Sequence, residues 1–194
     1  WWGLNDQIKG VGDRLAAQGY RALVPDLYRG KVGLSANEAE HLMNELDFGD
    51  AAGQDVAGAV SHLKTTGSAK VGVTGFCMGG ALTLLSAVFV PNMDAGVVWY
   101  GYPPLEFIDA SKIKAPLMAH FAIEDVPFPI ANVDELEHKL SAAKVSFEFH
   151  RYLAKHAFAN EEADSKGLAF LKYDAALAEL AWTRTMGFFD THLK

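Results

Sequence analysis

The single cysteine of this 194-residue chain stands in a setting that could make it a nucleophile. Cys77 lies in Gly75-Phe-Cys-Met-Gly79, after a β-branched run and before an apolar, small-residue segment. Glycines beside a nucleophile permit a strand-to-helix turn that Cβ atoms would obstruct, so the pattern predicts a nucleophile elbow with Cys in place of Ser. The start of a helix there would favour the thiolate. Taken alone, these residues are equally compatible with a small buried hydrophobic residue beside a tight turn.

An acid and a histidine follow the cysteine along the chain, each after a predicted strand. The order Cys77, Asp125, His156 is that of the α/β-hydrolase triad. His156 would take the thiol proton or pair with the thiolate, and Asp125 would orient the imidazole. The backbone N–H of Met78 would be one oxyanion donor.

Each of these assignments has an alternative. Asp125 could punctuate a proline-rich turn, and Glu124 could be the acid in its place. His156 is one of seven histidines. Of the others, three are expected on solvated helix faces and two within strands: His41, His138 and His192, then His120 and His150.

Alternating strands and helices must position these groups. Predicted strands lie at 21–25, 71–74, 95–100, 115–121 and 145–152, and predicted helices at 5–19, 35–46, 51–64, 78–89, 132–143 and 174–192. We expect 48–50 to break the second helix from the third, 71–74 to be buried, and 145–152 to lie near the sheet edge. The alternation predicts one α/β domain over 1–194, a mostly parallel sheet with helices on both faces. Reactive groups then collect at the carboxyl ends of the strands.

Composition narrows the class of partner. The net charge of −7 argues against nucleic acid or an anionic membrane as partner, and no apolar run is long enough to span a bilayer. A lone cysteine cannot form an internal disulfide and is typical of a reducing compartment, so we expect a cytoplasmic protein.

Five segments together resemble the dienelactone hydrolase family, in the family's order and across essentially the whole chain. They are Trp1-Trp-Gly-Leu-Asn5, Val24-Pro-Asp-Leu-Tyr28, Gly75-Phe-Cys-Met-Gly-Gly80, Glu124-Asp-Val-Pro127 and His156-Ala-Phe158. The resemblance implies an α/β-hydrolase fold and a Cys-Asp-His hydrolase of small lactones or esters that works through a thioester. It implies no metal or other cofactor, a small-molecule substrate, and a monomer or small homo-oligomer. The family's type activity is carboxymethylenebutenolide hydrolysis.

The start of the sequence departs from the family pattern. In the family a Glu that controls the ionisation of the thiol stands immediately before the segment matching Trp1, and this sequence begins one residue later. The second oxyanion N–H would fall on Trp1 itself. At least one upstream strand is also expected, so we predict an N-terminally incomplete domain.

The substrate-binding positions also depart from the family pattern. The arginines that hold the dienelactone carboxylate in well-known members are missing from helix 35–46 and from Asn160, four residues after His156. Arg29 and Tyr100 are the candidate substrate-binding residues, and Lys31 and Lys155 are further nearby cations. We therefore expect a substrate other than the dienelactone, or one that is bound differently. Lys155 would slightly disfavour an imidazolium at His156. The alternative function is a redox-reactive thiol or an inactive hydrolase-fold protein.

Overall fold

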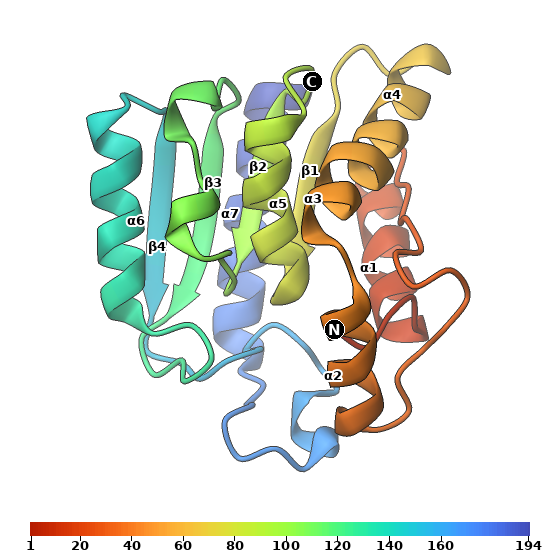
Figure 1. Ribbon diagram of the computed structural model, residues 1–194, viewed down its shortest axis with the longest axis vertical. Helices are drawn as coiled ribbons and strands as arrows, with labels where there is room; N and C mark the ends of the chain where they lie inside the picture. The colour runs from red at the N-terminus through yellow and green to blue at the C-terminus, as the bar shows by residue number, and fades with distance from the viewer.

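The computed structural model describes residues 1–194 and contains one four-stranded parallel sheet (Figure 1). Each strand pairs with the next strand in the chain, in the order β1-β2-β3-β4, from β1 (Gly72–Phe76) through β2 (Ala95–Trp99) and β3 (Leu117–Ala122) to β4 (Phe147–Tyr152). The register sets Phe76 opposite Trp99, and Trp99 opposite His120. The carboxyl ends of the strands therefore meet along one edge. The predicted α/β class and the edge position of β4 are confirmed.

Helices cover both faces of the sheet, as predicted. Figure 1 shows α5 and α6 in front of the sheet and α7 behind it. The helices are α1 (Asp6–Ala17), α2 (Ala36–Glu45), α3 (Phe48–Asp50), α4 (Ala57–Thr65), α5 (Met78–Phe89), α6 (Ile130–Ala142) and α7 (Ala175–Leu193). Short 3₁₀ turns occur at Leu105–Phe107, Ala110–Lys112 and Ala163–Lys166. None of the helices combines the length and the hydrophobicity that a membrane crossing requires.

Each face of the sheet carries its own hydrophobic core. On one face, Leu84 and Val88 of α5 and Leu136 of α6 pack against the inward side chains of the strands. On the other face, Val11 of α1 and Trp182 of α7 pack against alternate residues of the same strands. β2 and β3 are buried on both faces and, apart from His120, carry no polar side chain, as is typical of interior parallel strands.

The predicted strand at 21–25 is wrong, because this segment forms no strand pairing. A cavity of about 300 Å³, lined mainly by apolar side chains, lies between this segment and β1. The side chain of Arg21 instead reaches the turn after α4, where it donates to the carbonyl oxygen of Thr66 at 3.0 Å. As a result β1 has a strand partner on one side alone, and it is partly exposed rather than buried as predicted.

Helix boundaries follow the capping chemistry, and two of them differ from prediction. Asn5 and Ser35 are N-caps, since the side chain of Asn5 accepts from the N–H of Ile8 at 3.1 Å and that of Ser35 accepts from the N–H of Glu38 at 3.3 Å. Residues 48–50 do not break a helix but begin one: Asp47 caps α3, which continues through a π-helical stretch at Ala51–Val56 into α4. Helix α6 starts at Ile130, two residues before the predicted position.

Candidate active site

Cys77 occupies a sharp turn between the end of β1 and the start of α5. Its backbone has φ 55° and ψ −115°, a conformation that non-glycine residues rarely adopt. The turn is held by hydrogen bonds, because the N–H of Cys77 donates to the carbonyl oxygen of Trp99 at 2.9 Å. The carbonyl oxygen of Cys77 accepts from the N–H groups of Gly80 and Ala81, at 2.9 and 3.1 Å. The nucleophile candidate is thus presented by a strained but well-tethered backbone.

Glycines around this turn are required by close backbone approaches. A Cβ on Gly75 would lie 2.2 Å from the carbonyl oxygen of Gly79, and one on Gly80 would lie 2.7 Å from that of Trp99. Gly79 itself has open space, so the predicted steric need holds at Gly75 and not at Gly79. The tightest approach is at Gly101, where a Cβ would lie 1.9 Å from the carbonyl oxygen of Cys77. Sequence reasoning missed Gly101, because it follows a different strand.

The histidine and the acid meet beside this turn. Nδ1 of His156 lies 2.7 Å from Oδ2 of Asp125, and both residues are buried. The other carboxylate oxygen of Asp125 accepts the N–H of Phe128 at 2.8 Å. Glu124 is exposed, and its carboxylate forms no hydrogen bond or ion pair with the imidazole. Of the two candidate acids, Asp125 is the one that reaches His156.

The electrostatics of the pair favour charge separation. Burial raises the pKa of the Cys77 thiol, but a hydrogen bond and the positive charge of His156 outweigh it, and the net pKa is lowered. Burial lowers the pKa of His156, whereas hydrogen bonds to Asp125 and to Cys77 raise it, with a net value of about 9. Near neutral pH these directions favour a thiolate–imidazolium pair. The ammonium of Lys155, the residue next to His156 in the sequence, donates to the carbonyl oxygen of Ala169 at 3.2 Å.

The two predicted oxyanion donors lie beside the thiol. Met78 is the first residue of α5, where an N–H has no partner within the helix, and this N–H contributes to the lowered pKa of Cys77. The backbone nitrogen of Trp1 lies close to Cys77. The hydroxyl of Tyr28 lies 3.2 Å from the carbonyl oxygen of Trp1 and 3.3 Å from Sδ of Met78. Tyr28 therefore contacts both residues, a role that the sequence did not reveal.

Aromatic rings surround the imidazole of His156. The buried ring of Tyr100 meets it edge-on, with centroids 5.2 Å apart and planes at 73°. The ring of Phe128 stacks on it at 5.4 Å and 23°, and Phe170 is more distant at 6.4 Å. Tyr100, a predicted substrate-binding residue, is thus in the site but packs mainly against protein. Phe128 was not predicted, although an aromatic residue between two prolines directly after the candidate acid is a usable signal.

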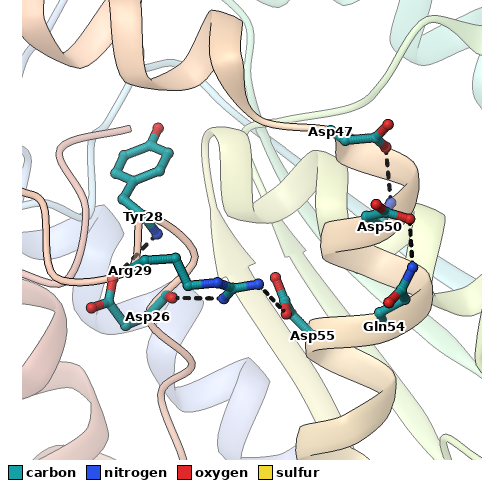
Figure 2. A network of polar contacts seen from close by, with 7 residues as sticks. All are labelled: Asp26, Tyr28, Arg29, Asp47, Asp50, Gln54 and Asp55. Carbon is teal, nitrogen blue, oxygen red and sulfur yellow. Dashed lines mark hydrogen bonds and ion pairs between the residues drawn. The ribbon is translucent and has the colours of Figure 1, made fainter.

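Arg29, the other predicted substrate-binding residue, is engaged elsewhere. Figure 2 shows its guanidinium reaching toward Asp55, away from the ring of Tyr28. The ion pair with Asp55 has an N–O distance of 2.7 Å, and the guanidinium also donates to the carbonyl oxygen of Asp26 at 3.1 Å. Its side chain is 69% exposed. The structure therefore does not bring Arg29 to the thiol.

Two of the other histidines, His120 and His41, contact residues outside the candidate site. His120 is buried between Tyr152 and Thr185, 2.9 Å from each hydroxyl, and burial lowers its pKa well below the ordinary value. His41 lies on the surface beside Glu45. No three His, Cys, Asp or Glu side chains are grouped so that they could hold a metal ion.

Comparisons with a family model, with related sequences and with solved structures all find similarity to dienelactone hydrolase-like proteins. The family model described as the dienelactone hydrolase family matches residues 1–193. Protein usf of Aquifex pyrophilus is 34% identical, over all of this chain and 85% of its own length. A protein of Aquifex aeolicus, provisionally named carboxymethylenebutenolidase, is 33% identical over all of this chain and 86% of its own length. The solved structure of a dienelactone hydrolase-like promiscuous phosphotriesterase from metagenomic libraries superposes with a TM-score of 0.88, at 25% identity, over all of this chain and 83% of that one.

Proposed function

This chain belongs to the dienelactone hydrolase family, and on that premise we propose that it hydrolyses small neutral lactones or carboxylic esters with Cys77 as nucleophile. The observation that carries the proposal is the connected set of Asp125, His156 and Cys77. In that set the pKa of the thiol is lowered and the pKa of the imidazole is raised. A resting ion pair of this kind supplies an activated nucleophile and a poised acid together.

The chemistry proceeds in two halves through a thioester. The Cys77 thiolate attacks the carbonyl carbon, and the N–H groups of Met78 and Trp1 stabilise the oxyanion that forms. As the C–O bond breaks, the His156 imidazolium gives its proton to the departing alkoxide, which in a lactone stays attached to the acyl chain. His156 then takes a proton from water, and the hydroxide attacks the thioester. Collapse of this second oxyanion releases the acid and restores the thiolate, and Asp125 orients the imidazole throughout.

A neutral substrate is proposed because the nearby cations are occupied or turned away. Arg29 is paired with Asp55, and Lys155 is directed to the carbonyl oxygen of Ala169. A substrate carboxylate buried without a cationic partner would lack hydrogen bonds that contribute about 1.5–3 kcal/mol each. An uncharged acyl group avoids this loss.

Kinetic assays and intact-mass spectra test the proposal. Cys77→Ala should abolish turnover of p-nitrophenyl esters, and one equivalent of a thiol-alkylating agent should block the unaltered protein. Intact-mass spectra during turnover should show the acyl group on Cys77. Retained turnover in Cys77→Ala would exclude the thioester route. A thousandfold preference for the dienelactone over neutral esters of similar size would overturn the substrate class.

A second candidate, a redox-reactive thiol, is favoured by the lowered pKa of Cys77, because thiolates oxidise more readily than thiols. Peroxide treatment followed by intact-mass analysis separates the two functions. Rapid formation of a sulfenic acid, with no burst of p-nitrophenol from the esters, would support the redox function over the hydrolase.

A further inference from the structure

Phe128 contacts two of the three triad candidates, each with a different part of the residue. Its backbone N–H donates to Oδ1 of Asp125 at 2.8 Å. Its ring stacks on the imidazole of His156, with centroids 5.4 Å apart and planes 23° from parallel. One residue in the loop after β3 therefore links the acid and the base.

The loop around Phe128 is constrained, so these contacts are held in place. Pro127 and Pro129 flank the residue and restrict the backbone on both sides. The rings of Tyr102 and Phe128 form a T-shaped pair, with centroids 5.1 Å apart and planes at 79°. The hydroxyl of Tyr102 donates to the carbonyl oxygen of Pro129 at 3.0 Å. The ring is thus in contact with a side chain that is itself anchored to the loop.

The orientation of the ring favours a cation at His156. An aromatic face attracts a positive charge within about 6 Å of its centroid, and the attraction grows when the pair is shielded from water. Among the aromatic neighbours of His156, only Phe128 is near-parallel, because Tyr100 lies at 73° and Phe170 lies at 47° and 6.4 Å.

The charged and titratable groups that face His156 are few. Asp125 lies on Nδ1, and the Cys77 thiol acts on the imidazole by hydrogen bonding and charge. The hydroxyl of Tyr100 stays neutral, since burial raises its pKa well above the ordinary value. The ammonium of Lys155 is directed to the carbonyl oxygen of Ala169.

We propose that Phe128 is a positioning residue of the triad, whose backbone N–H holds Asp125 and whose ring keeps His156 in its imidazolium form. The inference rests on the proposed function, because the imidazolium is the group that protonates the leaving alkoxide. By favouring the cation at His156, the ring also favours the thiolate at Cys77.

The test is a titration of His156 in the absence of substrate. Histidine labelled with ¹³C reports the protonation of His156 by NMR in the unaltered protein, Phe128→Leu and Phe128→Trp. Both variants keep the backbone N–H, so the bond to Asp125 is retained and the ring alone is changed. Phe128→Leu should lower the apparent pKa of His156 from about 9 by about half a unit. In Phe128→Trp, the apparent pKa of His156 should equal that of the unaltered protein or exceed it.

Two controls separate this role from simple packing. Phe170→Leu removes an aromatic neighbour that is not stacked, and it should leave the titration unchanged. Pentafluorophenylalanine at position 128 keeps the ring shape and reverses its quadrupole, so it should lower the apparent pKa at least as much as leucine, even if Phe128→Leu folds poorly. An unchanged titration in the fluorinated protein, or equal shifts for Phe128→Leu and Phe170→Leu, would overturn the proposal. Absence of esterase activity in the unaltered protein would instead reject the proposed function, because the titration uses no substrate.

Discussion

Replacing Gly101 with alanine should disable the proposed nucleophile without touching any triad side chain. The added Cβ would lie 1.9 Å from the carbonyl oxygen of Cys77 and 2.8 Å from its carbonyl carbon. Since real Cβ contacts are essentially never under 3.0 Å, the two backbones must separate from 1.9 Å to at least that distance. The same carbonyl oxygen accepts the N–H groups of Gly80 and Ala81, so the first turn of α5 must move as well.

Both stability and activity should report this movement. Overpacking of backbone against backbone should lower the free energy of unfolding by about 3 kcal/mol, the upper end for inserted atoms, and lower Tm by about 6–12 °C. Misplacing a nucleophile by about 1 Å should lower kcat/KM by about 100-fold. The measurements are calorimetric unfolding and p-nitrophenyl ester kinetics, corrected for the folded fraction.

A matched glycine provides the control. Gly58 lies in α4 with no atom within 4 Å of an added Cβ, so Gly58→Ala should raise stability by about 0.5–1 kcal/mol and leave kcat/KM unchanged. A Gly101→Ala protein with unchanged Tm and with kcat/KM within threefold of the unaltered enzyme would refute the reasoning.

Three further predictions concern the same site. In a pH–rate profile, activity should rise as the Cys77 thiol ionises and fall as His156 deprotonates near pH 9. Because the pKa of His156 is raised on folding, the contribution of this residue to the free energy of unfolding should be full below about pH 6.5 and lost as pH rises through 9, which a pH–unfolding profile would measure. Asp125→Asn should reduce kcat by about 10²–10⁴-fold and should lower the pKa of His156. Steady-state kinetics and NMR titration would measure these two effects, and an unaltered kcat would exclude Asp125 as the orienting acid. Tyr28→Phe should reduce kcat up to about tenfold with little change in KM, because the lost hydroxyl contacts Trp1 and Met78 rather than substrate, and a change confined to KM would contradict this.

The sequence predicted the elements whose signals are local. The helices that begin at Asn5 and Ser35 were predicted, because a cap and the N–H that it binds lie within one helical turn. The strand at 21–25 was predicted from apolar composition, but a strand also needs a hydrogen-bonding partner, and composition does not supply one. The π-helical stretch at Ala51–Val56 has no clear sequence signature, since the same residues are compatible with an α-helix.

Site residues could be predicted where their own chemistry marked them, but not where their role depends on contacts with residues far away in the sequence. Cys77, Asp125 and His156 could be proposed because each carries reactive chemistry after a predicted strand, in a recognisable order. The choice between Asp125 and Glu124 needed the geometry, because adjacent residues after a strand point in different directions. Gly101 and Phe128 escaped notice because their importance comes from neighbours brought close by the fold.

The order of the strands has a consequence for how the protein reaches its native state. Each strand pairs with the next in the chain, so every pairing closes one local connection. Cys77 follows β1, whereas His156 follows β4 and is the last of the three triad candidates to leave the ribosome. Until β4 joins the sheet, Cys77 has no imidazole partner and retains the low reactivity of an ordinary thiol. Thiol reactivity therefore depends on β4 joining the sheet, and the rate of alkylation of Cys77 during refolding would record when this happens.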